Sequence, residues 1–403
     1  MRILAVQPFI DGVGHYAPYA ARLCEDFSAR GHSVTLCTNT PASGLRTAHP
    51  FKVVAADFAL RPFEEVRSTH PLRWLSGRIR ANLKTLRAAL RLAPKSDVVQ
   101  LFSYELISTA ILLALVPSAR PVILEIAAPN FDTSKHYGSW AERIWRHLQK
   151  FAIQHLARHG LAAINVYSDS HAVELRRQLD VPAEFPIGVT ADSRPLTESS
   201  ISKADSRVRL GLPADATVFL FFGTLRRDKG LATLLEAFRG APPGCHLVIA
   251  GQPLDLDPPE IDDARITARY EFIPEDETEI YFTAADALVL PYERFYSGSS
   301  GPLFDACAYG LPVIASDVSE MGELVRAFTL GLSTIPGDAG SLAAALNRFH
   351  SLTPATRYQF SISERLFLKS SSTSSVANNY LKLYESLTGI PSDAGAAKTD
   401  ICQ

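Results

Sequence analysis

The feature that most constrains this chain is the alternation of short apolar runs with segments of helical period. The runs are apolar at nearly every position, which is typical of strands buried on both faces of a parallel sheet. We expect strands at Ile3–Val6, Val34–Cys37, Val98–Phe102, Val122–Ile126, Ala163–Val166, Val218–Phe222, Leu247–Ala250, Tyr270–Ile273, Ala287–Leu290 and Val313–Ala315. The sequence therefore predicts an α/β fold of doubly wound parallel sheets with helices on both faces.

A polar break divides this pattern into two parts. The segment TADSRPLTESSISKADSR, residues 190–207, has no periodicity and interrupts the alternation, as interdomain linkers do. A chain of 403 residues also exceeds what a single core usually supports. We predict an N-terminal domain over 1–190, a linker over 191–210 and a C-terminal domain over 211–365. A final helix over 366–388 would return to the N-terminal domain, before a loose tail over 389–403.

Charge and cysteine content narrow the functional classes. The formal net charge is -2, which gives no overall attraction to nucleic acid. The 5 cysteines are scattered without a CxxC pair, a pattern that favours a reducing compartment over a disulfide framework or a zinc site. The apolar start is too short for a signal peptide, and no apolar stretch approaches the roughly 20 residues of a membrane span. We expect a cytoplasmic protein.

The first motif with chemical content is FFGTLRRDKG, residues 221–230. An apolar strand runs into Gly223, a basic loop carries Arg226 and Arg227, and Lys229 stands where a helix begins. Backbone N–H groups at a helix N-terminus favour an anion, and a lysine there can neutralise a phosphate. The segment is equally compatible with a solvated basic turn.

The second motif is YSGSSGPLFDACAYGLPVIAS, residues 296–316. Its loop of small residues lets backbone approach a ligand, Pro302 suits the first turn of a helix, and Asp305 could accept hydrogen bonds from ribose hydroxyls. An ordinary capped helix, with Ser300 as N-cap, is the alternative. Because both motifs follow buried strands, we expect them to converge on one diphosphate at the carboxyl edge of the sheet.

The third motif, DGVGHYAPYA, is a glycine-containing turn that follows the first strand. Gly12 and Gly14 open the first helix, but the third glycine of the dinucleotide fingerprint is missing, which argues against a nicotinamide cofactor. His15 follows this turn and is a candidate site residue together with the two glycines.

A basic segment lies between Arg67 and Lys95, with eight Lys or Arg, no acid, and leucines at helical spacing. It could lie on an anionic membrane surface as a peripheral contact at the inner face. It could equally be a core-packed helix with a solvated basic face. No nucleic-acid reader motif accompanies the charge.

The C-terminal half resembles the retaining glycosyltransferases of family 4, which have the GT-B fold. The resemblance rests on FFGTLRRDKGLATLLEAF, HLVIAG, YEFIPEDETEIYFTAADALVLPYE and GPLFDACAYGLPVIASDVSEMGEL, which arrive in the family's order. It implies two Rossmann-like domains, a nucleoside-diphosphate sugar as donor, and no cofactor. It implies catalytic roles for Lys229, Arg226 and Asp305. The donor-binding residues it implies are Gly223, Thr224, Arg227, Gly251, Ile273, Glu293, Ser297, Gly298, Ser299, Ser300 and Gly301.

The chain departs from the family pattern in three places. The first glutamate of the Glu-x7-Glu motif falls at Ser297, with Glu293 nearby, and Asp305 stands for the second. Thr224 replaces the basic residue after the loop glycine, where Arg226 or Arg227 could substitute. The N-domain histidine is absent from residues 127–130.

The resemblance implies retaining sugar transfer to a glycan or lipid-linked acceptor, in polysaccharide biosynthesis. A degenerate GT-B protein that binds nucleotide without transfer is the alternative. A nucleotide-sugar epimerase is disfavoured, because no carboxylate set suits that chemistry. Asp255 and Asp257 form a DxD sequence, but we expect no metal requirement.

Overall fold

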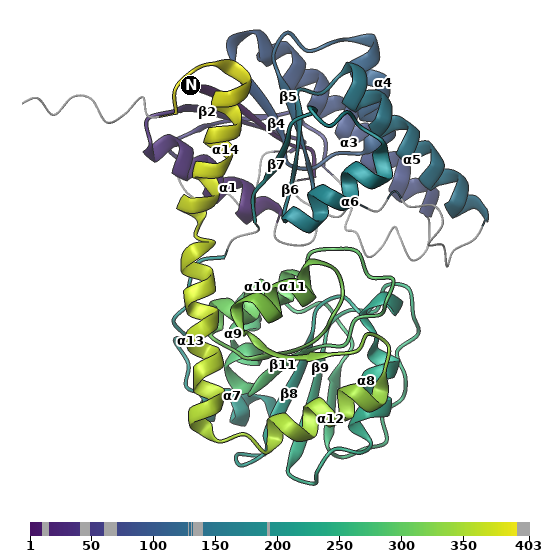
Figure 1. The fold of residues 1–403 in the computed structure, drawn as a ribbon, viewed down its shortest axis with the longest axis vertical. Coiled ribbons are helices and arrows are strands. Elements are labelled where there is room, and N and C mark those ends of the chain that lie inside the picture. The colour runs from purple at the N-terminus through teal and green to yellow at the C-terminus, as the bar shows by residue number, and fades with distance from the viewer. Residues whose placement is uncertain are drawn as a thin grey trace, which may run out of the picture. The chain divides into compact units, whose positions relative to one another are not determined.

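The computed structural model describes residues 1–9, 16–40, 49–59, 71–127, 129, 131, 140–191 and 194–392. The chain forms two compact units (Figure 1). Unit 1 comprises Met1–Ala191 and Thr373–Gln403, and unit 2 comprises Asp192–Ser372. Gly12, Gly14 and His15 fall outside the described residues, as does the start of the basic segment, residues 67–70.

The described part of unit 1 is built on a 7-stranded parallel sheet in the order β3-β2-β1-β4-β5-β6-β7. Its central strands are buried along nearly their whole length, as the apolar runs predict. The strands are β1 Arg2–Gln7, β2 Ser33–Thr38, β3 Lys52–Ala55, β4 Val98–Leu101, β5 Val122–Ile126, β6 Ala163–Val166 and β7 Ile187–Val189.

Helices cover both faces of this sheet. On one face α1 Tyr16–Ala29 packs beside α14 Thr373–Thr388, and Tyr19, Leu23 and Phe27 enter that core. The opposite core takes side chains from the helices α3 Pro71–Leu92, α4 Leu106–Leu115, α5 Trp140–His159 and α6 Asp169–Leu179. Among the described helices, none combines the length and the apolarity that a membrane-spanning segment needs.

The basic segment forms the helix α3, and its apolar side packs into the core. Leu86 and Ala89 are buried, and Leu83 and Leu90 pack partly buried against the same cluster. The opposite side of α3 leaves basic side chains such as Lys84 exposed to solvent. The structure therefore agrees with a core-packed helix that has a solvated basic face.

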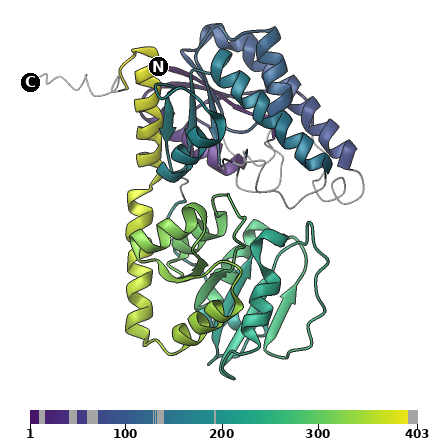
Figure 2. The same cartoon turned by 45° about the vertical axis from the view of Figure 1, so that its right-hand side comes forward.

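Unit 2 has a 6-stranded parallel sheet within its described residues, in the order β10-β9-β8-β11-β12-β13. The strands are β8 Thr217–Phe222, β9 Cys245–Ala250, β10 Ile266–Arg269, β11 Ala287–Leu290, β12 Val313–Ser316 and β13 Gly331–Thr334. The surrounding helices are α7 Lys203–Leu210, α8 Leu231–Phe238, α9 Glu275–Ala284, α10 Gly301–Tyr309, α11 Ser319–Phe328, α12 Ala339–His350 and α13 Pro354–Ser370. Figure 2 shows helices on both faces of this sheet as well.

Three boundaries differ from the sequence prediction. The strand expected at Tyr270–Ile273 is instead Ile266–Arg269, which pairs with β9. The second part of the predicted linker, 191–210, forms α7, because the Ser202 hydroxyl caps this helix by accepting from the Asp205 N–H at 3.1 Å. The single helix predicted over 366–388 is two helices, since α13 ends at Ser370 and α14 begins at Thr373.

Candidate functional site

Two glycines bring the loops after β8 and β9 into contact. The Gly223 N–H donates to the Ala250 carbonyl at 2.9 Å. A Cβ at Gly251 would collide with the backbone of Gly223, and both glycines have positive φ, 101° at Gly223 and 152° at Gly251. Only glycine fits such a close backbone approach. The loops after these two strands are therefore packed closely together at the carboxyl edge of the sheet.

Lys229 ends the basic loop and is buried. It closes the short 3₁₀ turn Arg227–Lys229, and Gly230 then turns the chain into α8 with a φ of 69°. Only 7% of Lys229 is exposed, and no hydrogen bond or ion pair holds its ammonium among the residues that the structure describes. Burial, and then the nearby charge of Arg226, lower the pKa of Lys229 to about 7.

The basic loop and the start of α10 meet at Lys229. A Cβ built on Gly223 would lie 3.3 Å from the Lys229 Nζ and 3.5 Å from the Pro302 ring, so the ammonium lies beside the first turn of α10. The two loops are also joined through their backbones, because the Glu293 N–H donates to the Asp228 carbonyl at 2.9 Å. The two motifs therefore lie side by side in unit 2, and their binding of one diphosphate stays a prediction.

The start of α10 has no side-chain cap. Ser300 occupies the N-cap position, but its hydroxyl pairs with the Tyr292 hydroxyl at 3.0 Å and caps no N–H. This differs from the capping role expected of Ser300. Nearby, the Tyr296 hydroxyl donates to the Ser299 carbonyl at 2.9 Å. The Ser299 Oγ is buried and has no hydrogen-bond partner among the described residues.

Asp305 lies one turn into α10, and a basic residue from outside both motifs holds it. The Arg194 Nε donates to the Asp305 Oδ1 at 2.9 Å, with 8% of the Arg194 side chain and 32% of the Asp305 side chain exposed. The Asp305 charge also reaches Lys229, where it opposes the effect of burial on the pKa. Asp305, Lys229 and Arg194 thus form one charged group in unit 2.

The two arginines of the basic loop are already engaged. Arg226 makes two hydrogen bonds to the Asp228 carboxylate, at 2.9 and 2.7 Å. Arg227 donates from its backbone to the Asp255 carboxylate at 2.9 Å and from its side chain to the Asp255 carbonyl at 3.0 Å. The first aspartate of the DxD sequence therefore fixes the basic loop.

The remaining predicted residues occupy different environments. Glu293 accepts from the Thr233 hydroxyl at 2.9 Å and lies beside Gly337, so it joins α8 to the loop before α12. Ile273 is a buried member of the unit 2 core. Thr224 is exposed, whereas Ser297 and Gly298 are partly buried in the loop before α10.

Four residues that contribute to this group were not predicted as site residues. Asp228 and Tyr292 stand inside the quoted motifs, and Tyr296 begins the second one, so a search for polar groups around Lys229 could have found them. Arg194 lies 111 positions from Asp305, and no local pattern marks it.

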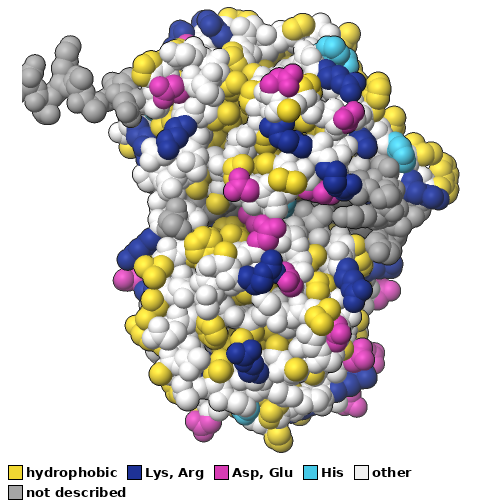
Figure 3. Space-filling model, in the orientation of Figure 1, with side chains coloured by type: hydrophobic (Ala, Val, Ile, Leu, Met, Phe, Trp, Pro, Cys, Tyr) yellow, Lys and Arg dark blue, Asp and Glu magenta, His cyan; other side chains and the backbone are white. Residues whose placement is uncertain are grey.

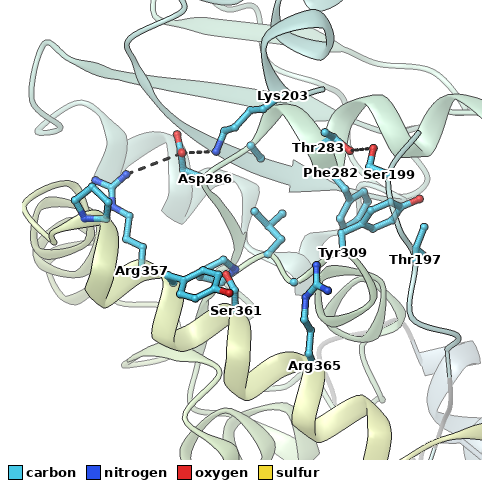
Figure 4. Close-up of a pocket in the computed structure, with 16 residues that line it drawn as sticks. Thr197, Ser199, Lys203, Phe282, Thr283, Asp286, Tyr309, Arg357, Ser361 and Arg365 are labelled. Atoms are coloured by element: carbon cyan, nitrogen blue, oxygen red, sulfur yellow. Dashed lines mark hydrogen bonds and ion pairs between the residues drawn. The ribbon is translucent and has the colours of Figure 1, made fainter. Parts of the chain in front are cut away.

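A separate hollow of about 490 Å³ lies at the opposite edge of the same sheet (Figure 4). Asp286 lies just before β11 and forms two ion pairs. Its Oδ1 is 2.6 Å from the Lys203 Nζ, and its Oδ2 is 2.8 Å from the Arg207 Nη2. Pro312, just before β12, also lines it. None of the predicted donor residues lines this hollow, so it is distinct from the group around Lys229.

Known proteins share this architecture and sequence pattern. A family model described as Glycosyl transferases group 1 matches residues 202–362, and one described as Glycosyl transferase 4-like domain matches residues 14–185. A curated relative, the glycogen synthase of Mycobacterium tuberculosis, is 28% identical over 374 residues, covering 86% of this chain and 85% of that protein.

Solved structures give the same fold. Sucrose-phosphate synthase from Thermosynechococcus elongatus superposes with a TM-score of 0.71 at 20% identity, covering 96% of this chain and 100% of that one. Anabaena HepE in complex with UDP-glucose has a TM-score of 0.65 at 17% identity, covering 97% of this chain and 100% of that one.

The fold of this chain is GT-B, with two parallel-sheet, Rossmann-like domains. The two family models and the curated relative together support glycosyltransferase function for it.

Proposed function

We propose that this chain transfers a sugar from a nucleoside-diphosphate sugar to a glycan or lipid-linked acceptor, with retention of the anomeric configuration. The observation that carries the proposal is Lys229, a buried lysine that no described residue pairs with by a hydrogen bond or ion pair, beside the start of a helix that no described side chain caps. An ammonium in such a place is costly to hold charged. A diphosphate would supply the missing negative charge.

The donor would be held by the loops that meet at Lys229. We assign the diphosphate to Lys229 and to the backbone N–H groups of the loop 297–301, and the nucleoside ribose to Asp305. The buried Ser299 hydroxyl, which no described residue pairs with, is a further hydrogen-bonding group for the donor. A solved neighbour, HepE, is described in complex with UDP-glucose, which supports a nucleotide sugar without identifying the base or sugar here.

In the transfer step, the bond between the sugar C1 and the diphosphate oxygen breaks while the acceptor hydroxyl bonds to C1 on the same face. The diphosphate oxygen leaves with the bonding electrons and accepts the proton that the acceptor hydroxyl loses. Lys229 would stabilise the departing negative charge, with Arg226 as a more distant positive charge held by Asp228. A preorganised charge in this position is worth about 2.7–4 kcal/mol in the barrier. The proposal requires no metal ion or cofactor.

The acceptor side is assigned to unit 1, with Gly12, Gly14 and His15 as its candidate residues. Synthesis of a polysaccharide or glycolipid in the cytoplasm, close to a membrane, would fit such an acceptor. We assign a peripheral membrane contact to the basic face of the segment 67–95, which also belongs to unit 1.

Product detection tests the proposal. The purified protein would be incubated with a panel of UDP-, GDP- and ADP-sugars. Slow hydrolysis of the donor would be measured as the amount of nucleoside diphosphate released. We expect one donor to be hydrolysed, and Lys229→Ala to lower that rate 10²- to 10³-fold. Lys369→Ala, an exposed lysine on α13, is the matched control and should leave the rate unchanged. Equal rates in wild type and Lys229→Ala would overturn the assignment.

Two observations favour a second function, nucleotide binding without transfer. Ser297 stands where the family pattern has its first glutamate, and Arg194 already occupies one carboxylate oxygen of Asp305. A protein of that kind would bind a nucleoside diphosphate yet release no nucleotide from any sugar donor in the panel.

A further inference from the structure

An apolar stripe on the helix α5 is exposed to solvent. Trp140, Ile144, Leu148 and Phe151 are 70%, 52%, 49% and 72% exposed. Their spacing of four, four and three residues places them on one face of the helix. A different face of α5, with Ile153 and Leu156, packs into the core of unit 1. The stripe is therefore a second apolar face that folding of this unit leaves uncovered.

The neighbouring helix α4 also ends in exposed apolar residues. Ile111, Leu115 and Val116, at the end of α4, are 55%, 75% and 49% exposed. Figures 1 and 2 show α3, α4 and α5 side by side on one face of the unit 1 sheet, and α4 packs against both neighbours. We call the four α5 residues and these three α4 residues the α4–α5 apolar surface.

Seven large exposed apolar side chains on adjacent helices are uncommon in a soluble unit. Single exposed apolar residues are normal, but contiguous patches mark sites of interaction. Figure 3 shows hydrophobic side chains along the edge of unit 1 where Figure 1 draws α4 and α5, together with basic side chains and histidine.

The charge around this surface is strongly positive. The sequences of α3 and α5 contain ten Lys or Arg and one acidic residue, Glu142, whereas the whole chain has a net charge of -2. Arg80, Lys84 and Arg87 on α3 are exposed, as are Arg143 and Arg158 on α5. The helix α6, which also packs against α5, carries two acidic and two basic residues, so the positive charge is concentrated on α5 itself and on α3, which packs against α4.

The combination of exposed apolar residues and basic charge favours one binding partner for this surface, an anionic lipid bilayer. A second copy of the chain would bring two basic surfaces face to face, which electrostatic repulsion opposes. An anionic bilayer offers apolar acyl chains to the exposed apolar residues and negative headgroups to the basic ones. Trp and Phe near the two ends of the stripe suit the boundary between headgroups and acyl chains.

We propose that the α4–α5 apolar surface inserts into the interface of an anionic lipid bilayer while basic side chains of α3 and α5 contact the headgroups. This differs from a membrane contact through α3 alone, because the apolar side of α3 is used in the core. The proposal does not depend on catalysis, since none of these residues belongs to the group around Lys229.

Vesicle flotation of the full chain tests the proposal. Phosphatidylcholine vesicles would be compared with vesicles containing about a third phosphatidylglycerol. We expect the wild type to float with the anionic vesicles, and less at high salt because screening weakens the headgroup contacts. The double variant Ile144→Ser/Phe151→Ser should lower binding at least tenfold, and Arg80→Gln/Lys84→Gln/Arg87→Gln should lower binding to anionic vesicles selectively.

Two controls separate this result from misfolding and from the transferase proposal. Val208→Ser removes an apolar residue of 79% exposure in unit 2 and should bind vesicles as the wild type does. Lys229→Ala should do the same, whatever its effect on turnover. Failure of the wild type to float, or unchanged binding by the Ile144/Phe151 variant, would overturn the proposal. So would self-association of the wild type, abolished by that variant, in place of vesicle binding.

Discussion

At the scale of single residues, the proposed chemistry centres on the Lys229 ammonium, which has no hydrogen bond or ion pair within the described part of the chain. Lys229 is buried, and its pKa is lowered to about 7 by burial and then by Arg226. Because the folded pKa is below that of the unfolded chain, Lys229 opposes folding progressively as the pH falls from about 10.5 towards 7. Strongly shifted pKa values cluster at functional sites, where a loss of folding stability accompanies a role in binding or catalysis. A bound anion would offset the loss of stability at Lys229.

Binding of a nucleoside diphosphate should therefore be coupled to proton uptake. At pH 8 the free Lys229 is largely neutral, and a bound diphosphate favours its charged form, so uptake should approach one proton per nucleotide. Calorimetry at pH 8 in two buffers of different ionisation enthalpy measures this number. Lys229→Arg, whose guanidinium stays charged, should show almost no uptake. Uptake that is absent in the wild type, or equal in the Arg variant, would contradict the assignment.

The residues around Lys229 differ in how well they can be predicted from the sequence. Lys229 and Asp305 follow buried strands within short motifs, so their positions could be predicted from strand and turn patterns. Arg194 could not, because its contact with Asp305 is created by tertiary folding of a segment that has no periodicity. The pairing of Ser300 with Tyr292, rather than with the helix backbone, depends on side-chain packing that a cap preference does not encode.

At the scale of secondary-structure elements, α14 is the final part of unit 1. Tyr380 and Tyr384 are fully buried, and their hydroxyls bond Glu125 and Gln100 in the interior of the sheet. Val376, Ala377 and Leu381 complete the same apolar core. The chain thus leaves unit 1 after β7 and returns to it only with its last helix.

Removal of α14 should unfold unit 1 preferentially. A chain ending at Ser372 loses the buried side chains of Val376, Tyr380, Leu381 and Tyr384, each worth about 1.5–3 kcal/mol, which is comparable to the whole stability of a domain. All three tryptophans of the chain, at positions 74, 140 and 145, belong to unit 1. Their fluorescence during urea unfolding should show a lost or strongly weakened transition.

A chain ending at Pro391 keeps α14 and serves as the control. Its tryptophan transition should match that of the full chain. A normal tryptophan transition in the shorter variant would show that α14 is dispensable for unit 1.

The strands show why some elements were predictable and others were not. Central strands such as Val122–Ile126 are buried at every position and read as continuous apolar runs. The strands β3, β7 and β13 lie at sheet edges, where fewer positions are buried. β10 was misplaced because Tyr270–Ile273 is richer in aromatic residues than Ile266–Arg269, although only the latter has the register to pair with β9.

At the scale of the whole molecule, two units with repeated strand and helix patterns explain how the sequence predicts a doubly wound fold. The pattern repeats on both sides of a polar break, and each half buries its own core. The break between α13 and α14, which passes the chain from unit 2 back to unit 1, falls at Ser371 and Ser372. Helical periodicity does not locate this break, because the segments before and after it are both helices.

The central claim is that the Lys229 turn and the start of α10 bind one diphosphate. Titration calorimetry of the full chain with UDP, GDP and ADP at pH 7 tests it most directly. We predict saturable binding of at least one nucleotide, weakened tenfold or more in Lys229→Met and unchanged in Lys369→Met. If the folded wild type binds none of the three, or if Lys229→Met binds as tightly as the wild type, the claim is contradicted.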